Sequence, residues 1–238
     1  MTSPAGVLPH TDYAQHRDLH EGNVCIRKVS EPKDHDPAHP DRRFGYSGLD
    51  ITILDYGLSR ADDPYADDDV PPVAYDLERD LSIFTSTHAA QCAVYRQMRS
   101  FLLRGDRKCL PAKSHNAPYE TAFDGEPISW AAFAPYTNVL WLAYTYRYLA
   151  DHFAGPKSEA ARFNRETREM WRYLKPGAAA GVPCFGSAGD VVRFAAESGW
   201  VLEEQIMGEN STLVEREDSI MVEDEDGVRV RRSARGRE

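Results

Sequence analysis

The sequence predicts an α+β fold that is mainly helical and carries one small β-hairpin. Residues 89–103 and 136–153 place apolar side chains at three- and four-residue spacing, which is the period of an amphipathic helix. Residues 24–26 and 51–54 are short runs rich in β-branched side chains, which are typical of strands. Residues 31–48 between these runs are polar and contain proline. The two runs are therefore expected to pair as a hairpin with a long connection.

A polar loop precedes the first strand run, and an acidic turn follows the second. The loop reads His-Arg-Asp-Leu-His-Glu-Gly-Asn from His16 to Asn23, and the turn reads Asp-Tyr-Gly from Asp55 to Gly57. Phosphoryl transfer asks a protein mainly for positioning and for charge neutralisation around the phosphates. Asp18 would accept the proton of an incoming hydroxyl, while Asn23 and Asp55 would hold Mg²⁺ at the phosphates of ATP. In this order and context, the pattern indicates the catalytic loop (16–23) and the metal turn (55–57) of a protein kinase.

These motifs resemble the larger lobe of protein kinases, the C-lobe. The predicted fold class is a protein-kinase-like C-lobe, mainly α-helical, in which the hairpin carries the metal turn. In a kinase, a small lobe before the catalytic loop supplies a Gly-rich loop, a strand lysine and its glutamate partner. Residues 1–15 contain none of these elements. We expect the chain as written to lack this lobe, to bind ATP poorly and to be inactive alone.

Further residues narrow the resemblance. Tyr56 replaces the usual phenylalanine, no Ala-Pro-Glu motif follows the turn, and residues 135–142 read Pro-Tyr-Thr-Asn-Val-Leu-Trp-Leu. Together these features resemble haspin-like serine/threonine kinases, from about His16 to about Phe153. The resemblance implies ATP and Mg²⁺ as cofactors and a preformed activation segment. It also implies a location in the nucleus, with the cytoplasm as the alternative, and phosphorylation of a threonine near the N-terminus of histone 3.

The resemblance also implies roles for individual residues of this chain. His20 and Asp80 would bind the basic histone tail as substrate-binding residues. Haspin-like sequences place a buried Asp before an Ile-Tyr-Arg stretch, where it hydrogen-bonds the catalytic loop, and Ala93 stands at that position here. An apolar residue beneath the loop is expected to leave buried backbone donors without a partner, at about 1–3 kcal/mol each.

Two other functions remain open. The chain could be a catalytically dead pseudokinase relic or scaffold that binds a basic, histone-like tail. A small-molecule kinase of the aminoglycoside or choline type shares a related loop and metal aspartate, but it does not account for residues 135–142. A Gly-rich loop and a strand lysine encoded upstream of Met1 would favour the active kinase over the relic.

Composition limits the partners. The formal net charge of −10 argues against a nucleic-acid binder and is compatible with a basic peptide substrate, although weak nucleic-acid contact by the basic residues 229–237 stays open. The cysteines are scattered without the paired spacing of a zinc site, and His35 and His39 alone do not complete one. No apolar run is long enough to span a bilayer, so no membrane partner is expected.

The expected order of segments follows from these patterns. Residues 1–15 form a frayed leader, 16–206 form the lobe, and 207–238 form a charged, disordered tail. Within the lobe we expect an extended, non-helical activation segment (59–84), the two amphipathic helices, a charged helix over 157–175, and a further helix capped by Ser187. Trp141 lies in an aromatic stripe at helical spacing, which is more often core than a ligand site.

Overall fold

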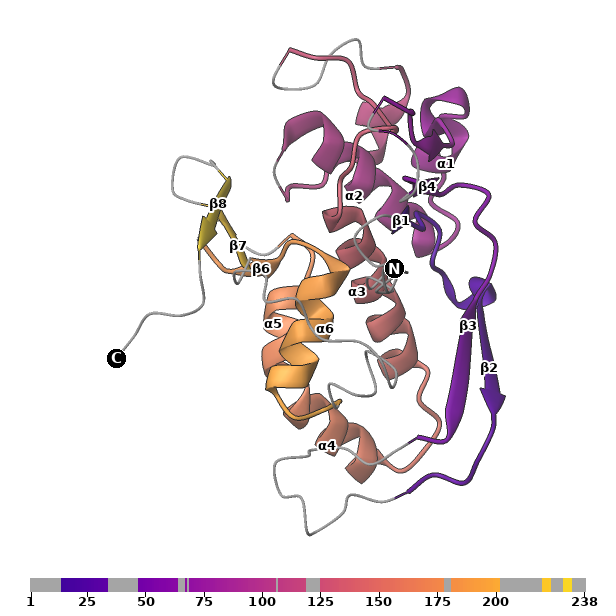
Figure 1. The fold of residues 1–238 in the computed structure, drawn as a ribbon, viewed down its shortest axis with the longest axis vertical. Helices are drawn as coiled ribbons and strands as arrows, with labels where there is room; N and C mark the ends of the chain where they lie inside the picture. The colour runs from indigo at the N-terminus through magenta and orange to yellow at the C-terminus, as the bar shows by residue number, and fades with distance from the viewer. Residues whose placement is uncertain are drawn as a thin grey trace, which may run out of the picture.

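The computed structural model describes residues 14–33, 47–63, 67, 69–105, 107–118, 125–177, 181–201, 220–223 and 229–232. Its α-helices are α1 (Ser82–Thr85), α2 (Gln91–Arg104), α3 (Tyr136–Asp151), α4 (Lys157–Glu166), α5 (Arg168–Leu174) and α6 (Ala188–Glu197). The 3₁₀ helices in this part of the chain are η2 (Glu21–Asn23), η3 (Leu77–Arg79) and η4 (Ala112–His115). Figure 1 shows α3 running down the centre of the view, with the hairpin on its right and α5 and α6 on its left.

Within the described residues, the strands form three small antiparallel sheets. The first contains β1 (Ala14–Gln15), β4 (Arg60–Ala61) and β5 (Val73–Ala74) in the order β1-β4-β5. The second is the hairpin of β2 (Val24–Lys28) and β3 (Leu49–Ile53). The third contains β6 (Cys184–Phe185), β7 (Ile220–Glu223) and β8 (Arg229–Arg232) in the order β6-β7-β8. The predicted hairpin is therefore present, and residues 34–46 of its connection, with His35 and His39, lie outside the described residues.

The core forms where α2 packs against α3. Met98 and Val139 are fully buried on the facing sides of the two helices, and the rings of Phe101 and Tyr136 lie 4.6 Å apart. Trp141 is also fully buried in this cluster, so the prediction that it belongs to the core is confirmed. Leu149, which shares the predicted apolar stripe, is 56% exposed because the last turns of α3 extend beyond this core.

Both long amphipathic helices form close to their predicted bounds. At the end of α2, Gly105 adopts a φ of 70° and its N–H donates to the carbonyl of Phe101 at 2.8 Å, which is a left-handed C-cap that glycine adopts without strain. The helix predicted after Ser187 is present as α6. Its capping box joins the Ser187 side chain to the N–H of Asp190 and the Asp190 carboxylate to the N–H of Ser187.

The helix predicted over residues 157–175 is divided at Thr167. Helix α4 ends at Glu166 and α5 begins at Arg168. The Thr167 hydroxyl lies 2.8 Å from the carbonyl of Phe163 and 2.6 Å from the hydroxyl of Tyr146. A threonine that bonds a carbonyl four residues earlier competes with the helical ladder and bends it, which accounts for the break.

The activation segment differs from the extended conformation that its prolines predict. It contains the strands β4 and β5, the 3₁₀ helix η3 and the short helix α1. Aspartate side chains cap these turns, since Asp76 accepts from the N–H of Glu78 at 3.0 Å and Asp80 accepts from the N–H of Ser82 at 2.9 Å. Such local side-chain bonds stabilise turns where the proline content alone predicts an extended chain.

Two predicted domain limits need correction. Ala14 and Gln15, assigned to a frayed leader, form β1 and pair with Ala61 and Arg60, so order begins before His16. Residues 220–223 and 229–232, assigned to a disordered tail, form β7 and β8 and pair with each other and with β6. The other residues of the predicted leader and tail lie outside the described part of the chain. Across the described residues, no helix has the length and apolar character needed to cross a bilayer.

Candidate active site

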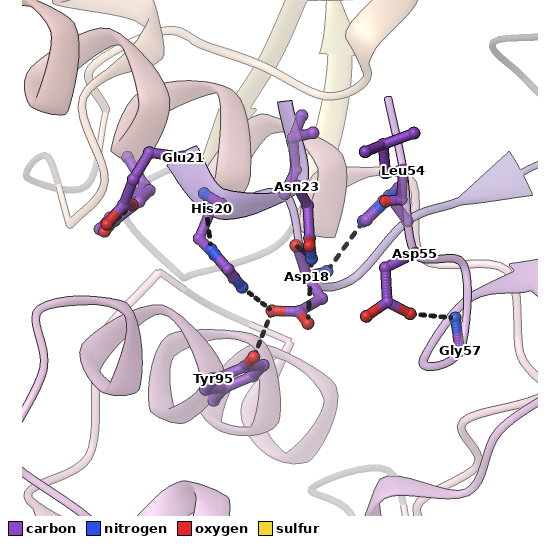
Figure 2. Close-up of polar contacts among 12 residues, drawn as sticks. Asp18, His20, Glu21, Asn23, Leu54, Asp55, Gly57 and Tyr95 are labelled. Atoms are coloured by element: carbon purple, nitrogen blue, oxygen red, sulfur yellow. Dashed lines mark hydrogen bonds and ion pairs between the residues drawn. The ribbon is translucent and has the colours of Figure 1, made fainter. Parts of the chain in front are cut away.

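The hairpin brings the catalytic loop and the metal turn together. Its register pairs Val24 with Ile53, and the N–H of Leu54 donates to the carbonyl of Asn23 at 2.9 Å just beyond that pair. The last residue of the catalytic loop and the first residue of the metal turn therefore lie at the same end of one ladder. Asn23 and Asp55, which are distant in sequence, become neighbours in this way (Figure 2).

The backbone is strained once in each motif. Arg17 has a φ of 65° and Asp55 has a φ of 57°, and no other non-glycine residue in the described part of the chain has a positive φ. This left-handed conformation is uncommon for residues with a Cβ, although a short polar side chain such as aspartate tolerates it better. At Asp55 the carboxylate Oδ1 accepts from the N–H of Gly57 at 3.1 Å, which stabilises the turn. Such conformations cluster at functional sites, so their coincidence with the two motifs marks this region as the candidate site.

His16 joins the two motifs through its ring. Its Nδ1 accepts from the N–H of Asp18 at 3.2 Å, which leaves the proton on Nε2 to be donated to the carbonyl of Leu54 at 2.8 Å. The ring also lies 4.8 Å from the ring of Tyr56, measured between centroids. One side chain therefore fixes the backbone next to Asp18 and the backbone next to Asp55.

Side chains of helix α3 form hydrogen bonds with the catalytic loop and with the strand before it. The Asn138 side chain accepts from the N–H of His16 at 3.2 Å and donates to the carbonyl of Ala14 at 2.9 Å. Nearer the C-terminal end of α3, the Thr145 hydroxyl donates to the carbonyl of Leu19 at 2.9 Å. The sequence identified residues 135–142 as a family motif but assigned no role to Asn138. A polar amide in a mostly apolar stretch of helix was the signal for this partly buried contact.

Asp18 sits at the centre of the polar contacts. The Asn23 amide donates to its backbone carbonyl at 2.9 Å and to its Oδ2 at 3.3 Å, while the Tyr95 hydroxyl donates to its Oδ1. Burial raises the pKa of Asp18 above the ordinary value for aspartate, and the nearby Asp55 carboxylate acts in the same direction. The hydrogen bond from Tyr95 and the two histidines of the loop act in the opposite direction without cancelling the rise. Tyr95 is a contact that sequence reasoning missed.

His20 lies beside Asp18, whereas Asp80 lies apart. The His20 Nε2 is 3.8 Å from Asp18 Oδ1, and its Nδ1 accepts from the N–H of Gly22 at 3.0 Å. A Cβ at Gly22 would stand 2.8 Å from the His20 ring, so glycine permits this approach. Asp80 is exposed in the activation segment, and within the described residues the contacts that join the other predicted site residues do not include it.

The donor groups suit a magnesium ion that is shared with phosphates. The Asn23 amide nitrogen is directed at Asp18, which leaves its carbonyl oxygen as a possible ligand. One Asp55 oxygen bonds Gly57, and Figure 2 shows the other turned toward Asp18. Among the described residues, no three His, Cys, Asp or Glu side chains form a cluster that could hold a metal alone. Mg²⁺ is often bound by one or two protein ligands plus the phosphates of its substrate, so Asn23 and Asp55 fit that use.

The prediction that Ala93 lies buried beneath the catalytic loop is wrong. Ala93 is exposed on α2 rather than buried under the catalytic loop. Among the α2 residues close to it, Cys92 and Tyr95 are the ones that are buried. The loop receives its support from Tyr95, His16, Asn138 and Thr145, so the loss of an acceptor at position 93 does not leave it unsupported.

Comparison of the sequence with known protein families identifies the kinase family of this chain. The family described as Haspin like kinase domain matches residues 11–180. The chain belongs to the haspin-like kinase family. The match extends beyond the likeness predicted for residues 16–153 at both ends. It includes strand β1, which the structure shows to be ordered.

Curated relatives agree with this membership. The chain is 29% identical over 145 residues to the serine/threonine-protein kinase haspin of Bos taurus, covering 60% of this chain and 15% of the relative. It is 30% identical over 139 residues to the haspin homolog of Drosophila melanogaster, covering 55% and 18%. It is 25% identical over 183 residues to a haspin homolog of Schizosaccharomyces pombe, covering 68% and 32%. The chain therefore spans less than a third of the length of each of these relatives.

Proposed function

We propose that this chain forms the catalytic lobe of a serine/threonine protein kinase that transfers the γ-phosphate of ATP. The observation that carries the proposal is the convergence of Asp18, Asn23 and Asp55 at the end of the hairpin, with a strained backbone in each motif. Family membership supports the same reaction, since the relatives are named serine/threonine-protein kinases.

Each side chain has one role in this reaction. Asp18 positions the hydroxyl of the substrate and accepts its proton as the phosphoryl group transfers. Asn23 and Asp55 would hold Mg²⁺, which neutralises charge on the phosphates of ATP. His16 keeps the two motifs in register through its bonds to Asp18 and Leu54, so the proton acceptor and the metal ligands keep a fixed relative position.

The proposed substrate is a threonine in the basic tail of histone 3, and the proposed location is the nucleus. The net charge of −10 favours a basic partner. His20 lies at the edge of the catalytic loop, and Asp80 presents an exposed carboxylate in the activation segment. Together with the family resemblance, these two residues support binding of the tail across this face.

A fused protein tests the proposal. The chain is joined behind the small lobe of a haspin-like kinase, which supplies the Gly-rich loop, the lysine and its glutamate partner. With ATP and Mg²⁺ it should phosphorylate a histone 3 tail peptide, and mass spectrometry of the product should locate the phosphate on a threonine. Peptide binding without phosphate transfer would contradict the proposal and favour the scaffold alternative.

These 238 residues on their own are expected to bind ATP and Mg²⁺ weakly. Asn23 and Asp55 would still attract the metal, but the 238 residues contain no Gly-rich loop or strand lysine to position the phosphates. Isothermal titration calorimetry measures this affinity, with the fused protein as the control for a competent site. A micromolar dissociation constant for the unfused chain would contradict the expectation.

Asp80→Asn is expected to weaken binding of the histone tail peptide and to make its salt dependence less steep. The variant removes one exposed negative charge from the proposed binding face, and attraction between exposed charges is screened by salt. Fluorescence anisotropy of the labelled peptide over a series of salt concentrations measures both effects. Asp151→Asn, a matched change on the exposed end of α3, should leave the affinity unchanged. If the two variants bind the peptide equally well, Asp80 does not belong to the site.

A further inference from the structure

Tyr95 reaches Asp18 from a different part of the chain. It lies on α2, 77 residues after Asp18, and its hydroxyl donates to Asp18 Oδ1 (Figure 2). The Tyr95 side chain belongs to the buried cluster between α2 and α3, with 7% of the residue exposed. The contact therefore connects the catalytic loop directly to the core.

The Tyr95 ring has little freedom to move. It meets the ring of Trp141 edge-on, at 5.3 Å between centroids and 74° between planes, and Trp141 is fully buried. Close-packed interiors hold such side chains in single rotamers. Tyr144, which donates to Glu21 Oε2 at 2.8 Å from α3, makes a similar bond to the same loop at an exposed position. It is therefore a natural comparison for Tyr95.

The two oxygens of Asp18 have different partners. Oδ1 accepts from Tyr95 and lies 3.8 Å from His20 Nε2, whereas the contact of Oδ2 among the described residues is the 3.3 Å hydrogen bond from the Asn23 amide. We propose that Tyr95 is a positioning residue that fixes the Asp18 carboxylate through Oδ1 and leaves Oδ2 to receive the proton of the substrate hydroxyl. The proposal rests on the proposed function for the role of Asp18, but the hydrogen bond can be tested without it.

The charges around Asp18 set the direction of the expected change. Burial and the Asp55 carboxylate raise the pKa of Asp18, and the Tyr95 hydroxyl, His20 and His16 lower it. Removing the hydroxyl should therefore raise the pKa of Asp18 further, since the ionised carboxylate loses a donor. Burial and the bond to Asp18 raise the pKa of Tyr95 strongly, with smaller effects from Cys92 and Asp55, so its phenol stays protonated as a donor.

The test is a titration of the unfused 238-residue protein, which requires no kinase activity. Carboxyl ¹³C NMR follows Asp18, whose resonance is assigned by its loss in Asp18→Asn. In Tyr95→Phe, the acid dissociation constant of Asp18 should fall about tenfold, moving its midpoint to higher pH. In Tyr144→Phe, the Asp18 midpoint should stay at the wild-type value. An unchanged midpoint in Tyr95→Phe, or an equal shift in both variants, would overturn the proposal.

A second measurement avoids changing Tyr95. In the wild-type protein, the Tyr95 ¹³Cζ resonance should shift with the same midpoint as Asp18, and the shift should vanish in Asp18→Asn. A Tyr95 resonance that does not respond to Asp18 would overturn the proposal even if Tyr95→Phe failed to fold. Absence of phosphoryl transfer by the fused protein would contradict the proposed function but would leave both titrations unaltered, so the two failures are distinguishable.

Discussion

Asp18→Asn is expected to lower kcat of the fused protein by roughly 10²–10⁴-fold, the usual contribution of a positioned proton acceptor. Asparagine keeps the size of the side chain and one oxygen to accept from Tyr95, so the fold and that contact should persist. What is lost is the ability to take the proton of the substrate hydroxyl. The measurement is steady-state phosphorylation of the histone tail peptide at saturating ATP.

The pH profile separates this role from a structural one. Because burial raises the pKa of Asp18, kcat/KM of the wild-type fused protein should fall as the pH drops through that raised value. This acid limb should therefore lie above the ordinary range of an aspartate, and it should be absent from the residual activity of Asp18→Asn. Asp50→Asn, which removes a carboxylate paired with Arg27 on the hairpin, is the control and should retain full activity. A loss below tenfold in Asp18→Asn would contradict the assignment of Asp18 as the base.

Glu78→Gln is expected to lower the free energy of unfolding by about 3 kcal/mol or more, since it leaves a buried charge without its counter-ion. Glu78 in η3 accepts two bonds from Arg99 of α2, Nε to Oε1 at 2.8 Å and Nη2 to Oε2 at 2.6 Å. The Arg99 side chain is fully buried, and its guanidinium lies 4.9 Å from the ring centre of Phe84. This ion pair ties the activation segment to the core of the lobe.

Urea denaturation of the unfused chain measures the change. Asp151→Asn is again the matched control, because it breaks the pair with Arg147 at 3.2 Å, in which both side chains are more than half exposed. Exposed pairs of this kind contribute about 0.5 kcal/mol or less. Equal stability losses in Glu78→Gln and Asp151→Asn would show that burial does not set the strength of the Glu78–Arg99 pair.

The sequence predicted those parts of the fold that depend on local periodicity. Helices α2 and α3 and the β2–β3 hairpin each follow from the spacing of apolar side chains within one segment. It did not predict β1, because a strand as short as Ala14–Gln15 forms only when Arg60 and Ala61 pair with it. It also missed the break at Thr167, which depends on whether one hydroxyl bonds to the backbone.

The motif residues of the candidate site were predicted, but the residues that support them were not. The residue types and order of the catalytic loop and the metal turn identified Asp18, Asn23 and Asp55, and the hairpin brings them together. The residues that hold this site belong to other helices. Tyr95 and Asn138 make contacts across more than seventy residues of sequence, which no local pattern encodes. Position 93 was misplaced because a family resemblance fixes an alignment but not the rotation of α2, which exposes Ala93.

Metal coordination distinguishes the proposed roles of the two aspartates, since Asp55 should be a metal ligand and Asp18 should not. The fused protein is labelled with ¹³C at aspartate carboxylates and loaded with ATP and Mn²⁺ in place of Mg²⁺, and electron–nuclear double resonance detects ¹³C bound to the metal. We expect a coupling from a directly coordinated carboxylate in the wild-type protein, retained in Asp18→Asn and lost in Asp55→Asn. A coupling that survives in Asp55→Asn, or that disappears in Asp18→Asn, would contradict the assignment of Asp55 as the metal-bound aspartate.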